Sequence, residues 1–210
     1  MKKLNTGLGY LKQAWLVLVL ALVFGMALAN VQAALGPRIE QNKLDEALEQ
    51  VPLLVRGAIA GVPVGLGDSR VYGALGAEGE LLGWVVMGNG QGFAGRIELL
   101  IGLDRSLDTV TGVYVLDQRE TPGLGNHITD EKWRLQFLGK KTHLPLEVIK
   151  EGVPAAHQIV AVTGATISSK SVAQAVNKAV NLVRSRKDVL QQETRRLEQM
   201  QPASKPRAGE

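Results

Sequence analysis

The apolar run from Ala14 to Ala29 constrains this chain more than any other feature. It carries no charged residue, and residues 30–35 lengthen it without adding one. The whole stretch is long enough for a helix that spans a bilayer, which needs about 17 to 25 residues. Three lysines precede it, and lysines stay on the cytoplasmic side. We therefore expect a cytoplasmic N-terminus over residues 1–13, a transmembrane anchor over residues 14–35, and an exported remainder.

A cleaved signal peptide is the alternative for this segment. The triplets Ala27-Leu28-Ala29 and Val31-Gln32-Ala33 both satisfy the small-residue rule for cleavage. The apolar run lies at the upper limit of length for a signal peptide, so a retained anchor is the preferred interpretation. In a Gram-negative cell, this predicts a single-pass protein of the inner membrane with its main domain in the periplasm.

Composition excludes several classes of function. The chain has no cysteine, which removes disulfides, zinc–thiolate sites and iron–sulfur clusters. Its histidines lack metal-ligand spacing, so no metal site is expected; they are His127, His143 and His157. Aromatic residues make up 4% of the chain, and the basic residues gather near the two ends. This pattern does not predict a nucleic-acid partner.

The segment 36–187 has the pattern of a single α+β domain with a small mixed or antiparallel sheet and flanking helices. Pro37 is expected to separate it from the anchor. Apolar periodicity predicts helices over 39–55 and 167–189, and Thr129-Asp130-Glu131 is typical of a helix start, with Gly139 as the stop. Strands are predicted over 71–75, 81–87, 96–103 and 109–117, and short extended segments over 148–150 and 158–162.

Glycine-rich and polar stretches complete the prediction. The segment from Gly57 to Gly67 contains glycine and proline and is expected to be a loop, and Gly88 to Gly92 is expected to be a turn. Residues 188–210 are polar and rich in arginine, which predicts a disordered tail.

A hydroxyl-bearing motif, Thr163-Gly164-Ala165-Thr166, opens the predicted helix that begins near residue 167. The first turn of a helix has unpaired N–H groups and a partial positive charge, so it stabilises an anion such as a phosphate. Gly164 and Ala165 leave room for a bulky group beside the backbone. The simpler alternative is that Thr163, Thr166 or Ser168 caps the helix, as such residues commonly do.

A second motif, Glu120-Thr121-Pro122-Gly123-Leu124-Gly125, lies about forty residues earlier. Pro122 stiffens a turn, while Gly123 and Gly125 permit backbone conformations closed to other residues. Glycines also let a flat ring pass close to the main chain. An ordinary surface loop is the alternative, but the presence of two special motifs in one domain favours a binding site.

With these two motifs and the N-terminal anchor, the sequence resembles the FMN-binding-domain family. The similarity extends from the anchor through residues 39–187 and is greatest to the G subunits of Rnf-type electron transport complexes. It implies that the loop lines a flavin and that the Thr166 hydroxyl carries FMN through a phosphoester bond. The cofactor-binding residues implied are Glu120, Thr121, Gly123, Leu124, Gly125, Thr163, Gly164, Ala165 and Thr166.

The resemblance also implies a function, that of a covalently flavinylated electron-transfer subunit of an ion-translocating ferredoxin:NAD oxidoreductase complex. Its expected partners are the other subunits of that complex and an FMN transferase. An exported protein has no supply of free flavin, so a covalent bond prevents loss of the cofactor. No acid–base or nucleophile constellation predicts an independent enzyme.

Three alternatives remain open at the level of sequence. The C subunit of sodium-pumping NADH:quinone reductase shares both motifs. An anchored scaffold subunit without cofactor is another, since Val160 stands where the family often has Asp. A soluble secreted ligand-binding protein is the third, if the apolar run is cleaved.

Overall fold

The structure of the chain is a computed structural model that describes residues 2–67 and 69–199, with side chains described for 14–67 and 69–197. The chain divides into two compact units, residues 1–45 and residues 46–210, which are treated separately. The second unit begins at residue 46, whereas the sequence predicts a domain that begins at residue 36.

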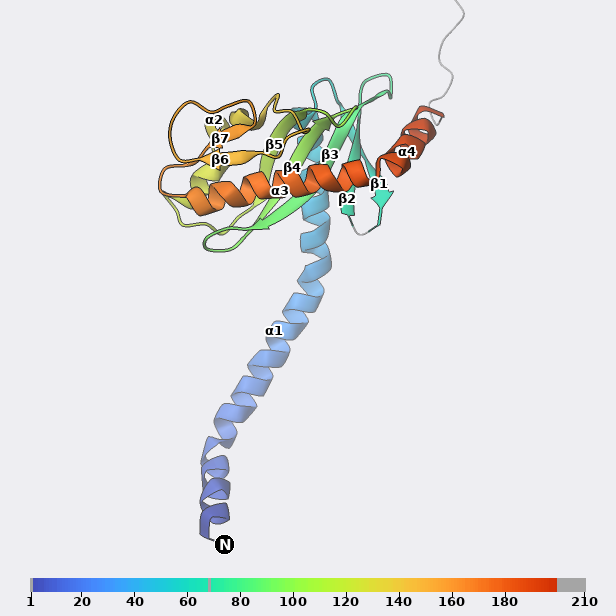
Figure 1. The fold of residues 1–210 in the computed structure, drawn as a ribbon. Coiled ribbons are helices and arrows are strands. Elements are labelled where there is room, and N and C mark those ends of the chain that lie inside the picture. The colour runs from blue at the N-terminus through green and yellow to red at the C-terminus, as the bar shows by residue number, and fades with distance from the viewer. Residues whose placement is uncertain (1, 68, 200–210) are drawn as a thin grey trace, which may run out of the picture. The chain divides into compact units, whose positions relative to one another are not determined.

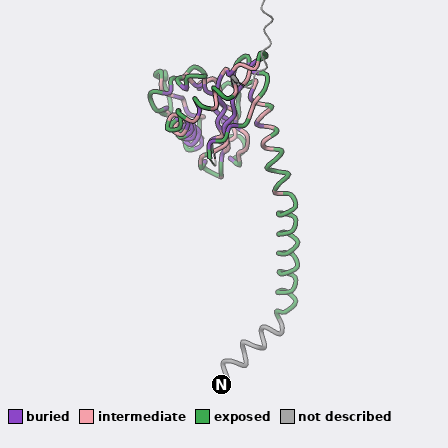
Figure 2. Tube along the Cα trace, turned by 90° about the vertical axis from the view of Figure 1, so that its right-hand side faces the viewer, coloured by how far each residue is buried: buried purple, intermediate pink, exposed green. Residues whose placement is uncertain are grey.

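Helix α1, Lys2–Leu54, provides the described part of the first unit, and its last residues belong to the second (Figure 1). It is long and apolar enough from Ala14 onward to cross a membrane, and no other helix among the described residues is. Its side chains over residues 14–34 are exposed (Figure 2). The expected break at Pro37 is wrong, because α1 continues through it. A proline removes one helical hydrogen bond, and the strong helical patterns on both sides outweigh that loss.

The second unit contains an antiparallel sheet whose strands follow one another in chain order (Figure 1). This arrangement confirms the predicted α+β class with an antiparallel sheet, and all four predicted strands are present. The five strands are β1 (Ala60–Leu66), β2 (Ser69–Leu75), β3 (Leu81–Gln91), β4 (Arg96–Asp104) and β5 (Val110–Asp117).

The loop predicted over 57–67 is wrong, because β1 occupies most of it. Glycine and proline usually mark loops, but Pro63 is tolerated here since β1 is an edge strand with a neighbour on one side only. Val64 and Leu66 alternate into the core and supply the apolar face that strand formation needs.

Helix α3, Thr166–Ser185, covers one face of the sheet (Figure 1). Its apolar stripe, including the buried Val172 and Val176, packs on the core as predicted. The turn predicted over Gly88–Gly92 is wrong, since β3 runs to Gln91. A Cβ at Gly90 would lie 2.4 Å from Ser171 Oγ, and one at Gly88 would lie 3.4 Å from a helix carbonyl. These glycines let α3 approach the strand.

The other face of the sheet receives the last turns of α1, within the second unit. Val51 and Leu54 are buried there. A Cβ built on Gly102 of β4 would lie 2.7 Å from the Leu54 carbonyl oxygen, and one on Gly61 would lie 2.8 Å from Val51 Cγ2. Glycine is therefore required where the helix contacts the strands, because any side chain would push it away.

Shorter elements follow β5. The predicted helix start near residue 130 is confirmed, and Gly139, with φ of 78°, follows the end of that helical segment. The two predicted extended segments form a separate parallel pair. These elements are η1 (Gly125–Thr129), α2 (Glu131–Arg134), η2 (Leu135–Phe137), β6 (Glu147–Ile149) and β7 (Gln158–Val160).

The predicted disordered tail is wrong over its first part, where α4 spans Lys187–Gln199. Residues 200–210 lie outside the described residues. Leu190 is buried, and a Cβ on Gly73 would lie 3.2 Å from Leu197 Cδ1. Leu190 and Leu197, seven residues apart, thus attach α4 to the sheet although the helix is polar in composition. The single helix predicted over 167–189 is divided into α3 and α4.

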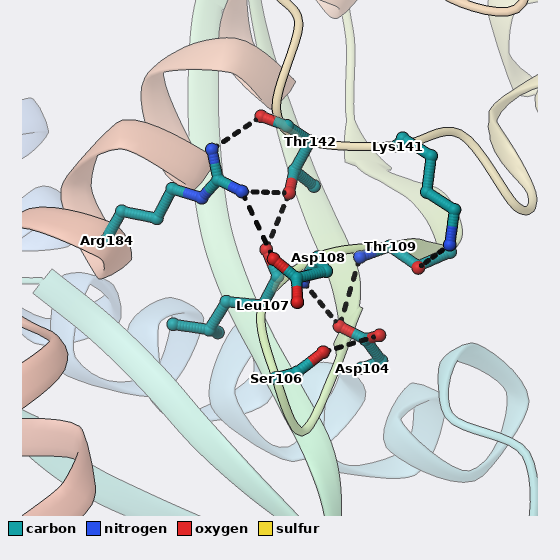
Figure 3. A network of polar contacts seen from close by, with 8 residues as sticks. All are labelled: Asp104, Ser106, Leu107, Asp108, Thr109, Lys141, Thr142 and Arg184. Atoms are coloured by element: carbon teal, nitrogen blue, oxygen red, sulfur yellow. Dashed lines mark hydrogen bonds and ion pairs between the residues drawn. The ribbon is translucent and has the colours of Figure 1, made fainter.

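A polar network attaches the C-terminal turn of α3 to the loops beside it (Figure 3). Arg184 donates to the Thr142 carbonyl at 2.8 Å and to the Thr142 hydroxyl at 2.9 Å. The same hydroxyl donates to the Leu107 carbonyl at 2.6 Å. Asp104 holds the β4–β5 turn by accepting from the N–H groups of Asp108 and Thr109. This end of α3 is therefore fixed.

The glycine contact with α1 yields a test of the fold. We expect Gly102→Ala to lower the free energy of unfolding by about 1 to 3 kcal/mol, because the new Cβ overlaps the Leu54 carbonyl. Gly65→Ala is the matched control, since nothing lies within 4 Å of its Cβ position. Denaturant unfolding of the purified protein measures both, and equal stability of the two variants would contradict the packing described.

Candidate functional site

The structure brings the two sequence motifs together at the start of α3. A Cβ at Gly164 would lie 3.0 Å from Leu124 Cδ2, so the Leu124 side chain lies against the second motif. A Cβ at Gly125 would lie 3.0 Å from Ser168 Oγ in the first turn of α3. Residues about forty positions apart in the chain thus form one site.

Each motif contains a tight turn with a glycine at its third position. Leu124 N–H donates to the Thr121 carbonyl at 3.1 Å, and Ala165 N–H donates to the Val162 carbonyl at 2.9 Å. Gly123 has φ of 77° and Gly164 has φ of 79°. Such turns require positive φ at this position, which glycine adopts without strain. The glycines therefore set the shape of both loops.

The Glu120 carboxylate points into the protein and holds three segments together. The residue is 6% exposed. One oxygen accepts hydrogen bonds from the N–H groups of Ala94 and Gly95, at 3.1 and 3.3 Å. The other accepts from Phe93 N–H at 3.2 Å and from the Ser168 hydroxyl. The carboxylate thereby joins the β3–β4 turn, the first turn of α3 and its own loop.

Two glycines make room for this carboxylate. A Cβ at Gly92 would lie 2.2 Å from one carboxylate oxygen of Glu120, and a Cβ at Gly125 would lie 2.6 Å from the other. Glu120, expected to line the cofactor, instead lies behind the surface and supports it. Gly125 is buried in the same way, while Thr121, Gly123 and Leu124 are exposed.

Burial raises the pKa of Glu120, but hydrogen bonds from the Ser168 hydroxyl and from three backbone N–H groups lower it by more. The net effect holds the pKa of this carboxyl below its ordinary value of 4.5. The group is therefore ionised at neutral pH, and its hydrogen bonds are of the stronger, charge-assisted kind.

Thr166 is the first residue of α3 and is partly exposed. The capping alternative is not realised, because Ala165 is the N-cap and no side chain caps the helix. Among the described residues, the Thr166 hydroxyl has no hydrogen-bond partner. Ser169 fixes the turn before it, accepting from Val162 N–H at 3.0 Å and donating to the Ala165 carbonyl at 2.9 Å. A free hydroxyl thus stands at a helix N-terminus on a well-held backbone.

Three exposed apolar side chains lie on the segments that Glu120 joins. Phe93 is 71% exposed, Leu124 is 47% exposed and Ile167 is 55% exposed. Sequence reasoning did not identify Phe93, since no local motif links it to Glu120, which lies 27 positions later in the chain. It also did not identify the roles of Ser168 and Ser169.

Fold and site together define an α+β domain with an N-terminal apolar helix and a loop-built site at one end of α3. Residues 92–181 match the family model of the FMN-binding domain. This segment contains both motifs, and the resemblance to that family is confirmed.

The curated relatives are named as subunits of ion-translocating or Na(+)-translocating oxidoreductases, and the alignments cover about a third to three fifths of their lengths. The G subunit of the ion-translocating oxidoreductase complex of Methanosarcina acetivorans is 37% identical over 53% of this chain and 57% of its own. The G subunit of the Na(+)-translocating ferredoxin:NAD(+) oxidoreductase complex of Acetobacterium woodii is 34% identical over 50% of this chain and 51% of its own. The C subunit of the Na(+)-translocating NADH-quinone reductase of Vibrio anguillarum is 35% identical over 42% of this chain and 37% of its own.

A solved structure has the same fold. It is the crystal structure of NqrC from Shewanella oneidensis, with a TM-score of 0.54 and 24% sequence identity. The match covers 65% of this chain and 72% of that one. The likeness confirms the fold class that the sequence predicts.

The buried carboxylate predicts a pH-dependent stability. Because the folded-state pKa of Glu120 is lowered, its stabilisation is present above the ordinary pKa and is lost as the pH falls through the folded-state value. We expect Glu120→Gln to cost about 1 to 3 kcal/mol at pH 7. The difference from wild type should shrink towards pH 3. A difference in unfolding free energy that does not change between pH 7 and pH 3 would contradict this role.

Proposed function

We propose that this chain is a covalently flavinylated electron-transfer subunit of a membrane-bound, ion-translocating ferredoxin:NAD oxidoreductase complex. The observation that carries the proposal is the free Thr166 hydroxyl at the first position of α3, within the segment that matches the FMN-binding domain. The names of two similar subunits, those of Methanosarcina and Acetobacterium, support the complex type.

The residues present fit FMN held through a phosphoester. The Thr166 hydroxyl is the acceptor, and the unpaired N–H groups of the first turn of α3 stabilise the phosphate charge beside it. Gly164, whose φ is 79°, keeps the approach to the backbone open. Ser169 anchors this turn to the helix, so the acceptor does not shift when the group is attached.

The exposed apolar side chains provide a surface for the flat ring. Leu124 lies against Gly164, and Phe93 and Ile167 lie on the adjoining segments. We assign them the roles of orienting the ring and excluding water from one side of it. Thr121, Gly123 and Thr163 are exposed and complete the lining, while Ala165 is buried like Glu120 and Gly125 and supports it from behind. FMN, when bound, supplies the electron-transfer chemistry.

The setting of the site follows from the anchor. We propose that α1 crosses the inner membrane once, with residues 1–13 in the cytoplasm and the flavin domain in the periplasm, because the lysines lie before the apolar run. An FMN transferase then attaches the cofactor. The Thr166 oxygen forms the new bond to phosphorus as the phosphoanhydride bond of a flavin dinucleotide donor breaks, the nucleoside monophosphate leaves and the hydroxyl proton is lost. The other subunits of the complex supply and accept electrons.

A second candidate is the C subunit of a sodium-pumping NADH:quinone reductase. The 35% identity to the Vibrio anguillarum protein favours it. Both candidates use the same acceptor, so the partners that copurify from native membranes distinguish them. An anchored scaffold without flavin is the remaining alternative, and the flavin content of the protein decides it.

Substitution of the acceptor tests attachment directly. In a host that has an FMN transferase, we expect Thr166→Val to abolish the mass increment of one FMN and leave the protein colourless. Thr166→Ser should retain attachment, since it keeps a hydroxyl. Thr194→Val is the matched control, since Thr194 is a partly exposed threonine of α4 outside both motifs, and it should carry flavin like wild type. Intact mass after acid denaturation measures the bound flavin. A Thr166→Val variant that still carries covalent FMN would defeat the assignment.

A further inference from the structure

A groove of about 570 Å³ lies on the second unit, away from the flavin site. The end of α1, strand β5 and the α2–η2 segment form its walls, and no residue of the two motifs lines it. Its volume lies within the range of ligand-binding cavities, about 300 to 1,000 Å³. The proposed function leaves this groove without a role.

The rim of the groove is apolar and exposed. Leu53, at the end of α1, is 78% exposed, and Leu135 and Leu138, at the start of η2 and just after it, are 55% and 56% exposed. Contiguous apolar side chains of this kind mark a protein-binding surface.

Two guanidinium groups border the apolar rim. Arg134 stacks over the Tyr114 ring at 5.3 Å and donates to the carbonyls of Thr129 and Val113 at 2.9 and 3.0 Å. The Arg134 guanidinium is therefore held in place by an aromatic ring and two carbonyls, which are neutral and leave its positive charge unbalanced. Arg56 has no carboxylate partner among the described residues. Glu131 is the one acidic residue of the lining, so the groove keeps a net positive charge.

The edge of β5 is already covered where it borders the groove. Val110 N–H donates to the Lys140 carbonyl at 2.9 Å, and Gly139 N–H donates to the Val110 carbonyl at 2.8 Å. The Val113 carbonyl accepts from Arg134. A partner cannot add a strand here and must bind through side chains, as an amphipathic helix does in an apolar groove.

We propose that this groove binds a helix of another subunit of the same complex, with an apolar stripe for the three leucines and a carboxylate for Arg56. The positive rim is complementary to an acidic partner, so the bound helix is expected to carry a carboxylate. The proposal rests on the proposed function, because that function makes the chain a subunit of a complex. In this proposal, the face around Leu53 binds the partner subunit and the face around Thr166 carries the flavin.

The test uses the full chain coexpressed with the other subunits of its complex. We expect Leu53→Asp to reduce the amount retained by a tagged partner subunit about tenfold or more, through lost apolar contact and repulsion from the partner carboxylate. Arg56→Glu should reduce it as well. Salt in the wash should then no longer weaken binding, because the variant repels the partner carboxylate and salt screens that repulsion. Val153→Asp is the matched control, since Val153 is 96% exposed and does not line the groove.

Covalent flavin per chain, read from intact mass, separates this proposal from the proposed function. We expect all three variants to carry flavin like wild type, which also shows that they fold. Retention of Leu53→Asp and Arg56→Glu equal to that of Val153→Asp would overturn the docking proposal and leave the flavin assignment standing. A Leu53-dependent dimer of the isolated chain would also overturn it, because a second copy would then occupy the groove.

Discussion

The Glu120 carboxylate is the interaction on which the functional end of this domain depends. It accepts hydrogen bonds from the β3–β4 turn and from the first turn of α3, two segments that share no sequence neighbourhood. Burying a charge is costly unless it is hydrogen-bonded, and here the donors offset that cost. Because the same group fixes the backbone of Phe93 and the position of Ser168, the exposed apolar side chains and the proposed acceptor hydroxyl of Thr166 keep one geometry.

Helix α3 carries this geometry because it is held at both ends. Ser168 and Ser169 attach its first turn to Glu120 and Val162, and Arg184 attaches its last turn to Thr142 (Figure 3). Between these ends its apolar stripe packs on the sheet. A site on such a helix is more exact than one on free loops, which suits the proposed role in holding a cofactor for electron transfer.

Much of the fold could be predicted from local patterns. Alternating or β-branched runs located strands β2 to β5, and the apolar period of residues 172–183 located α3 and its buried face. The failures concern glycine and proline. Gly61, Gly88 and Gly90 indicate loops or turns by composition, yet each lies in a strand where a helix approaches closely. A glycine required by a long-range contact cannot be distinguished from one required by a turn in a single sequence, because the second partner is distant in the chain.

The sequence by itself determined the apolar helix, the α+β class, the two motifs and Thr166 as the residue at the start of α3, since each depends on local composition or spacing. The tertiary structure alone decided that Glu120 and Gly125 lie behind the site, that Phe93 joins it, and that an apolar groove with a positive rim forms at β5. These features depend on which residues meet across the fold, and a carboxylate has the same local pattern whether it faces a ligand or accepts backbone hydrogen bonds.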